Sequence, residues 1–235
     1  MKASDIANAR RDFAKILGPD AAYLKIKPNT KQPVGSFLEG RRNRYKRPPK
    51  AGSYGVIPQG RLFILDIDVN KGGVLKEQIE LFSELLKIDL TTTLTVISPS
   101  GGQHFYLRLP ENSETKNFPK ANLRKYAKEI LAITGIPSIV DADIRSGAAA
   151  AYVLGPTSSI NNRRYMIAGN KEIQTIGDEG LKHLLSLEKK REKARKKHKL
   201  PEVESTANLF LDPDRELTHD LPAQSVITAI YKGVG

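Results

Sequence analysis

The segment Leu62–Val69 limits the possible folds more than any other part of the chain, because its side chains alternate in character. In an extended strand, successive side chains point to opposite faces of a sheet. One face of this segment is wholly apolar and consists of Phe63, Leu65, Ile67 and Val69. The other face changes from apolar to doubly anionic and consists of Leu62, Ile64, Asp66 and Asp68. The segment therefore predicts a strand that presents two carboxylates just before a turn at residues 70–73.

Two acidic side chains at neighbouring positions on one face repel each other, so a bound cation is their simplest partner. An isolated Asp-x-Asp also occurs where a strand merely runs out into solvent. The pattern must recur on other strands before it favours a functional site.

The same alternation recurs in two later segments. In the first, Phe105, Leu107 and Leu109 alternate with Gly102, His104, Tyr106 and Arg108. In the second, Val140, Ala142 and Ile144 alternate with Asp141, Asp143 and Arg145. Three strands with one apolar and one polar face predict a sheet that helices cover on one side and that stays open on the other.

Apolar repeats predict the covering helices, over Ser4–Leu17, Val74–Lys87 and Lys120–Ile133. Further strands are expected at Ala21–Ile26, Leu94–Ile97, Ala149–Leu154 and Arg164–Ala168. Near Gly177 the character changes to a leucine-rich helix start followed by a strongly basic stretch, with a last short helix over Leu221–Tyr231. We therefore divide the chain into a main domain over residues 1–176 and a small basic helical region over residues 177–235.

The charge balance points to a polyanionic partner, and nucleic acid fits best. The chain of 235 residues has 38 Lys and Arg against 26 Asp and Glu, a formal net charge of +12. A loop-like segment concentrates this charge around one aromatic ring, in Arg41, Arg42, Arg44, Tyr45 and Arg47. The guanidinium groups would hold phosphates while Tyr45 stacks on a base. The alternative is a loop that is simply solvated.

Composition also excludes several classes of protein. The chain has no cysteine, which rules out disulfides and thiolate zinc sites, so no zinc is expected. No apolar run approaches the length of a membrane span, and the N-terminus lacks the apolar core of a signal peptide. We expect a cytoplasmic protein with no membrane partner, and we expect the chain to continue into a larger protein.

The polar faces of the three strands bring together Asp66, Asp68, His104, Asp143 and Arg145. Oxygen ligands suit Mg²⁺ or Mn²⁺, and acids at this spacing can converge on two ions for phosphoryl transfer. His104 and Arg145 would then be donors to a polyphosphate. Asp141 shares the face with Asp143, and periodicity does not choose between them.

A turn at Ser100, Gly101 and Gly102 adds backbone N–H groups that can approach an anion closely. Each feature alone has a structural explanation: an ordinary hairpin turn, a buried histidine, an Asp143–Arg145 pair. Their occurrence together, in register, favours a site.

These motifs, in this order, resemble the primase-polymerase (prim-pol) domain of the archaeo-eukaryotic primase superfamily, found in phage and plasmid replication proteins. The resemblance covers roughly residues 21–168 and rests on Lys31–Pro33, Tyr54–Val56, Gly60, Leu65–Asp68, Ser100–Tyr106, Val140–Arg145, Gly155–Ser158 and Tyr165. It implies an α+β fold with an RRM-like palm sheet, and synthesis and extension of primers on single-stranded DNA from NTP or dNTP. A helicase module could follow this chain.

The resemblance also implies roles for single residues. Asp66, Asp68 and Asp143 match the metal ligands, which resolves the choice against Asp141, and His104 matches the contact to the nucleotide phosphates. Arg145 matches a phosphate contact. Two departures stand out: Gly102 replaces a serine that relatives often carry, and residues 148–151 are alanines where glycines are expected.

Two other functions fit the same residues less well. A non-catalytic RRM-like module would read bases with exposed aromatic side chains, but the polar face offers acids and Tyr106. A metal-dependent nuclease could use the same acids to activate water, although donors placed for a triphosphate argue against it.

Overall fold

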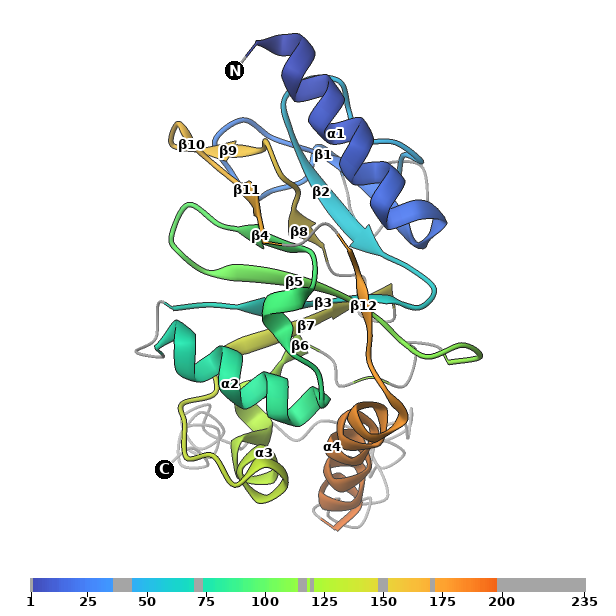
Figure 1. Cartoon of the computed structure of the whole chain (residues 1–235), viewed down its shortest axis with the longest axis vertical. Coiled ribbons are helices and arrows are strands. Elements are labelled where there is room, and N and C mark those ends of the chain that lie inside the picture. Colours follow the sequence, from blue (N-terminus) through green and yellow to red (C-terminus); the bar gives the residue numbers. More distant parts are fainter. Residues whose placement is uncertain are drawn as a thin grey trace, which may run out of the picture. The chain divides into compact units, whose positions relative to one another are not determined.

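The central layer of the structure is a sheet of seven of the described strands (Figure 1). Its order is β11-β4-β5-β3-β7-β6, and β12 pairs with β5. The bounds are Leu62–Ile67 for β3, Thr95–Ile97 for β4, Gln103–Arg108 for β5, Ala121–Asn122 for β6, Ala142–Ser146 for β7, Met166–Ala168 for β11 and Gln174–Thr175 for β12. This computed structural model describes residues 2–35, 44–69, 74–113, 118, 121–147, 152–169 and 172–197, with only the backbone of 121 and 189–197.

Strand β3 lies between β5 and β7 and pairs antiparallel with both. The register places His104 and Asp143 opposite Asp66, one on each side. Two residues earlier along β3, on the same face, Tyr106 and Arg145 lie opposite Ile64. The three alternating segments of the sequence are thus adjacent strands, as predicted, and their polar residues share rows across the sheet.

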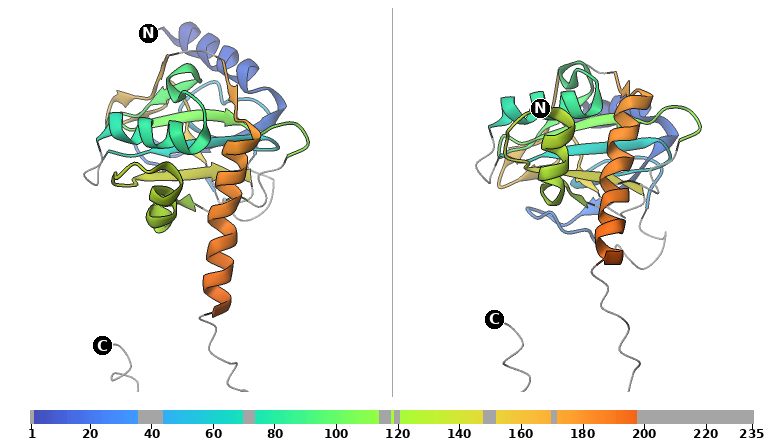
Figure 2. Two further views of the ribbon diagram at one scale, coloured as in Figure 1. Left: turned by 60° about the horizontal axis from the view of Figure 1, so that its bottom comes forward. Right: turned by 90° about the horizontal axis from the view of Figure 1, so that it is seen from below.

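Helices cover the apolar face of this sheet (Figure 2). They are α2 (Leu75–Leu86), α3 (Ala127–Thr134) and the start of α4 (Asp178–Lys197). The core between helices and sheet contains the apolar side of β3 together with residues of β5, β7 and the helices, among them Phe63, Leu65, Ile67, Phe82, Phe105, Leu107, Ile144 and Leu184. Burial of these side chains is the main force that holds the strands in place. The mixed α+β architecture agrees with the prediction.

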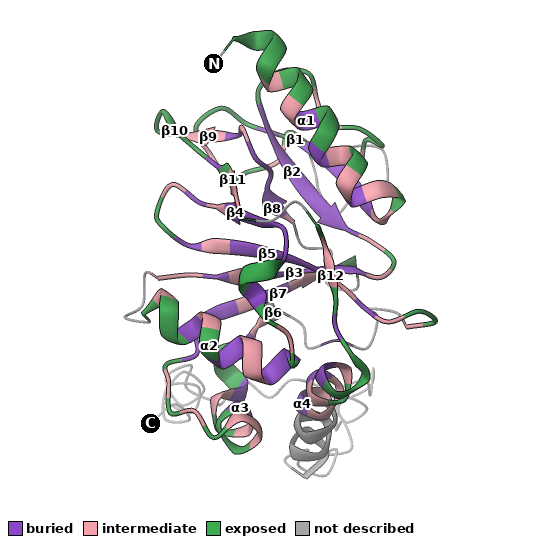
Figure 3. Cartoon of the chain, in the orientation of Figure 1, coloured by how far each residue is buried: buried purple, intermediate pink, exposed green. Residues whose placement is uncertain are grey.

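The expectation of an open opposite face is wrong over much of its length. A second layer covers it, made of a three-stranded sheet, β1 (Ala21–Ile26), β2 (Ser53–Pro58) and β8 (Val153–Leu154), together with α1 (Ala3–Leu17). Leu62, Ile64 and Tyr106 of the central sheet are fully buried in this second core. The reason is that Leu62 and Ile64 precede the acids on the same face of β3, and Tyr106 of β5 lies opposite Ile64. These side chains must also leave water. Figure 3 shows β2, β3 and β5 as largely buried strands.

Several boundaries differ from the predicted ones. The first helix begins at Ala3 rather than after a Ser4 cap, and the backbone N–H of Lys2 donates to Asp5 Oδ2 (3.0 Å). The helix predicted from Lys120 begins only at Ala127, because Asn122 pairs with β7 and its side chain caps a 3₁₀ turn at Leu123–Tyr126. A short hairpin, β9 (Ser159–Ile160) and β10 (Arg163–Arg164), precedes β11.

The helix predicted over Leu221–Tyr231 lies outside the described residues, as do Ala148–Ala151. In the described part of the chain, no helix is both long and apolar enough to cross a membrane.

The contact between α4 and α2 generates the first testable prediction. Gly180 is buried, and a Cβ at this position would collide with the backbone of Leu86 at the end of α2. We expect Gly180→Ala to lower the free energy of unfolding by about 1–3 kcal/mol through overpacking. Urea denaturation measures this change.

Gly177→Ala is the matched control, since a Cβ there would meet nothing within 4 Å. The control is expected to unfold like the wild type. Equal stability of both variants would show that α4 is not packed against α2 in this way.

Candidate active site

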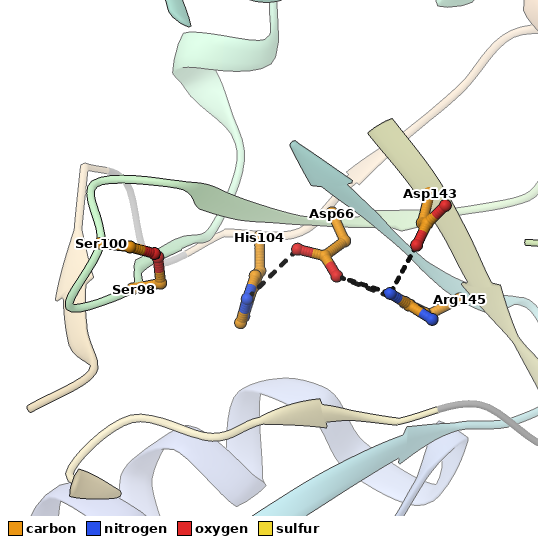
Figure 4. Close-up of polar contacts among 6 residues, drawn as sticks. All are labelled: Asp66, Ser98, Ser100, His104, Asp143 and Arg145. Carbon is orange, nitrogen blue, oxygen red and sulfur yellow. Dashed lines mark hydrogen bonds and ion pairs between the residues drawn. The ribbon is translucent and has the colours of Figure 1, made fainter. Parts of the chain in front are cut away.

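Asp66 lies between two cationic or polar side chains from the neighbouring strands (Figure 4). On the β5 side, His104 Nε2 is 3.4 Å from Asp66 Oδ1. On the β7 side, Arg145 donates to Asp66 Oδ2 through Nη2 (3.1 Å) and Nε (3.3 Å). Both oxygens of one carboxylate therefore have a partner, and each partner comes from a different strand.

Arg145 also connects Asp66 with the second acid of the same row. Its Nη2 donates to Asp143 Oδ2 at 2.6 Å. The side chains of Asp66, Asp143 and Arg145 are only 14%, 23% and 26% exposed. In a partly desolvated site two facing carboxylates repel strongly, so the guanidinium acts as the cation between them.

Asp68 follows β3 and is half-buried. Burial, together with the negative charges of Asp66, Asp141 and Asp143, raises the pKa of Asp68, and the charge of Lys31 opposes this rise. A raised pKa means that the carboxylate form carries uncompensated repulsion. The position therefore favours an additional positive charge.

Asp143 and Asp141 are distinguished by the register. Asp143 lies opposite Asp66 and shares Arg145 with it, whereas Asp141 precedes β7. The backbone of Asp141 holds the strand ends together: its carbonyl accepts from Asp68 N (3.0 Å), and its N–H donates to Gln78 Oε1 (2.9 Å). Gln78 is fully buried in α2 and also donates to the carbonyl of Ile139.

His104 is buried, with 6% of the residue exposed. Burial lowers the pKa of its imidazole, and the nearby Asp66 only partly opposes this. Among the described residues, His104 Nδ1 has no hydrogen-bond partner. A buried polar atom without a partner is costly in a folded protein, so it marks a position where a ligand could bind.

The ring of Tyr165 faces His104, with 5.6 Å between the ring centroids. Burial and the charges of Asp66 and Asp68 raise the pKa of Tyr165 to about 12, so its hydroxyl stays protonated at neutral pH. A neutral hydroxyl near these acids can donate a hydrogen bond.

The turn at residues 98–102 lies directly against the end of β3. Ser98 N donates to Gly102 O (2.8 Å), Gly101 adopts φ +93°, and the hydroxyls of Ser98 and Ser100 are 3.0 Å apart. A Cβ at Gly102 would lie 2.8 Å from the carbonyl oxygen of Ile67 and 3.5 Å from Asp68 Oδ1. This close approach explains why the chain has glycine where a serine was expected, and it leaves Ser98 and Ser100 as the hydroxyls of the turn.

A comparison with protein-family models matches residues 17–179 to the N-terminal domain of bifunctional DNA primase/polymerases, the Prim-Pol family. The chain belongs to the Prim-Pol family. No curated protein matches the chain significantly. The matched region includes the site residues Asp66, Asp68, His104, Asp143 and Arg145 and the turn at residues 98–102. The site described above therefore lies within a Prim-Pol domain.

The donor set of this Prim-Pol site fits a hard divalent cation, since Asp66, Asp68 and Asp143 offer only oxygen. Among the described residues, no three His, Asp or Glu side chains already form a metal-binding group. Asp66 and Asp143 instead share the guanidinium of Arg145 as a counter-cation. In this structure the positive charge between Asp66 and Asp143 comes from a side chain.

Periodicity did not identify several residues of the site. Lys31 influences both Asp68 and His104, and its carbonyl accepts from the hydroxyl of Tyr152. Its signal in the sequence is the Lys-x-Pro that resembles the family. Gln78 and Ser98 have no comparable signal, because their roles depend on contacts between distant segments.

The predicted template-binding residues lie elsewhere. Arg41 and Arg42 are outside the described residues. Arg44 and Tyr45 lie near the edge of β1, where Tyr45 exchanges two backbone hydrogen bonds with Tyr23. Arg47 lines a hollow beside α1.

The bridging role of Arg145 generates a prediction. Arg145→Ala leaves Asp66 and Asp143 without their counter-cation, so we expect the metal-free protein to lose about 1–3 kcal/mol of stability. Added Mn²⁺ should raise the melting temperature of this variant more than that of the wild type, because the metal no longer competes with a guanidinium. Thermal unfolding with and without Mn²⁺ measures both effects.

The control is Arg164→Ala on β10, which removes an exposed arginine. It should match the wild type in both measurements. An Arg145→Ala variant with wild-type stability and a wild-type response to Mn²⁺ would contradict the bridging role.

Proposed function

We propose that this protein is a template-dependent nucleotidyltransferase that synthesises and extends primers on single-stranded DNA. The observation that carries the proposal is the row His104–Asp66–Asp143 across three adjacent strands, within a chain of the Prim-Pol family. Nucleotidyl transfer needs acids that bind metal ions close to side chains that donate hydrogen bonds to phosphates.

Asp66, Asp68 and Asp143 would hold Mg²⁺ or Mn²⁺, as two ions. When bound, such ions activate the attacking 3′-hydroxyl and neutralise the charge of the leaving pyrophosphate. The raised pKa of Asp68 supports this assignment, since excess negative charge is already concentrated there. The rigid pairing of β3 with two neighbours holds the acids in position before substrate arrives.

His104, Arg145 and the turn at Ser100, Gly101 and Gly102 would hold the triphosphate. His104 Nδ1 is a buried nitrogen without a partner in the described structure. Because Nε2 faces Asp66 Oδ1, Nδ1 would donate to a phosphate oxygen in the imidazolium form, which a nearby phosphate charge would favour. Arg145 could exchange its carboxylate partners for phosphate oxygens, because the planar guanidinium forms paired hydrogen bonds with either group. Glycine at positions 101 and 102 lets the chain approach an anion closely.

The structure weakens the alternative of a non-catalytic RRM-like module. That reading needs exposed aromatic rings on the sheet, but Tyr106 is fully buried beneath the second layer. The division into a catalytic domain over residues 1–176 and a basic helical region over 177–235 that helps to grip nucleic acid remains a prediction.

Primer synthesis on single-stranded DNA with Mn²⁺ or Mg²⁺ tests the proposal. We expect labelled products in the presence of template and nucleotides, and a loss of at least about 100-fold for Asp66→Asn, Asp68→Asn and Asp143→Asn. The reason is that each change removes one negative charge from the proposed ligand set.

Glu77→Gln on α2 is the control, since it removes an exposed acid, and it should leave synthesis unchanged. Undiminished synthesis by the three Asn variants would refute the assigned roles. Degradation of DNA without added nucleotides would instead favour a nuclease.

A further inference from the structure

A groove of about 740 Å³ lies between α1 and the segment that precedes β2. The described residues that line it include six basic side chains and no acidic one: Arg10, Arg11, Lys15, Lys46, Arg47 and Lys50. Basic side chains without an acidic one give the groove a positive potential that suits a polyanion.

The α1 wall of the groove is one face of that helix. Its lining residues Ala7, Arg11, Ala14, Lys15 and Gly18 follow the three- and four-residue spacing that places side chains on the same side. Ala7, Ala14 and Gly18 have small or no side chains, which leaves space in the groove, and basic side chains lie around this space. Lys15, Lys46 and Lys50 are exposed. Arg11 donates to Asn8 and lies 4.0 Å from Asp12, both exposed contacts with which a phosphate can compete.

Arg10 fixes the opposite wall. This residue is only 4% exposed, and its guanidinium donates to Pro49 O (2.6 Å), Gly52 O (2.6 Å) and Thr157 Oγ1 (2.8 Å). It also lies over the ring of Tyr54, 4.9 Å from the centroid. The segment that precedes β2 is thus anchored to α1 before any ligand binds. Binding therefore costs little conformational entropy in this segment.

A second hollow of about 560 Å³ adjoins the groove beside β1, since Gly18 and Lys46 line both. Arg44 and Tyr45 line this second hollow. The Tyr45 side chain is accessible, with the residue 41% exposed, while its backbone is held by Tyr23 and its ring lies 5.5 Å from Lys25 Nζ. The second hollow therefore adds a fixed aromatic ring to the row of cations.

We propose that the groove and the adjoining hollow bind the phosphate backbone of single-stranded DNA, with Tyr45 stacking on a base. Phosphates attract the lysines and arginines without regard to sequence, and a base can stack on an aromatic ring only where it is unpaired. The proposal rests on the proposed function, which requires a template strand. The groove belongs to the layer of α1 and β1, whereas the acids belong to the central sheet (Figure 1).

Fluorescence anisotropy with a single-stranded oligodeoxynucleotide tests the groove directly. We expect Lys15→Glu/Lys50→Glu, which reverses one charge on each wall, to weaken binding at least about tenfold. The slope of log affinity against log salt should fall by about 1.4, since each lost phosphate contact on a single strand contributes about 0.7. Tyr45→Ala should weaken single-strand binding but not duplex binding.

The matched control is Lys125→Glu/Lys128→Glu, which makes the same charge change at exposed positions around the start of α3. It should lose much less affinity. Lys15→Gln/Lys50→Gln gives the same comparison without introduced acids, should the first variant not fold. Wild-type affinity of the groove variants, a loss equal to that of the control, or duplex binding as tight as single-strand binding would overturn the proposal.

Two further measurements separate this proposal from neighbouring ones. Wild-type protein that binds single strands through the groove but makes no primers would refute the proposed function and leave the groove standing. Loss of binding to vesicles of anionic lipid in the groove variants, with DNA binding unchanged, would assign the groove to a membrane surface and overturn the proposal.

Discussion

The arrangement of the site depends on the contacts of the Asp66 carboxylate, which shares the positive charge of Arg145 with Asp143. One carboxylate has His104 on one oxygen and Arg145 on the other, and Arg145 extends the row to Asp143. Antiparallel pairing of β3 with β5 and β7 makes the row possible, because residues opposite each other lie within side-chain reach. A shift of one residue in either pairing would turn the acids toward the helical core.

Hydrophobic burial on both sides of the sheet keeps this register in place. Phe63, Leu65 and Ile67 anchor β3 beneath the helices, while Leu62 and Ile64 anchor it beneath the second layer. Only toward the end of the strand does the second face become polar. The acids therefore lie where two apolar cores end, partly shielded from water, and their electrostatic interactions are stronger than at an open surface.

The three strands, their apolar faces and the meeting of Asp66 with His104 could be predicted from period-2 alternation. The choice of Asp143 over Asp141 came from the resemblance to the prim-pol domain, because both acids share one face. The second layer could not be predicted, because Leu62, Ile64 and Tyr106 do not reveal which distant segment buries them. Likewise, the sequence predicts Arg145 as a phosphate contact, whereas its contact with both acids depends on the register between β3 and β7. Gln78 was missed for the same reason, since it supports Asp141 from a helix far away in the chain.

The central claim is that Asp66 is placed to share a divalent cation. Electron paramagnetic resonance of free Mn²⁺, titrated with protein, tests it without requiring catalysis. Wild-type protein should remove Mn²⁺ from solution, and Asp66→Asn, which keeps the side-chain shape but removes the charge, should not. Equal Mn²⁺ binding by the two proteins would contradict the account.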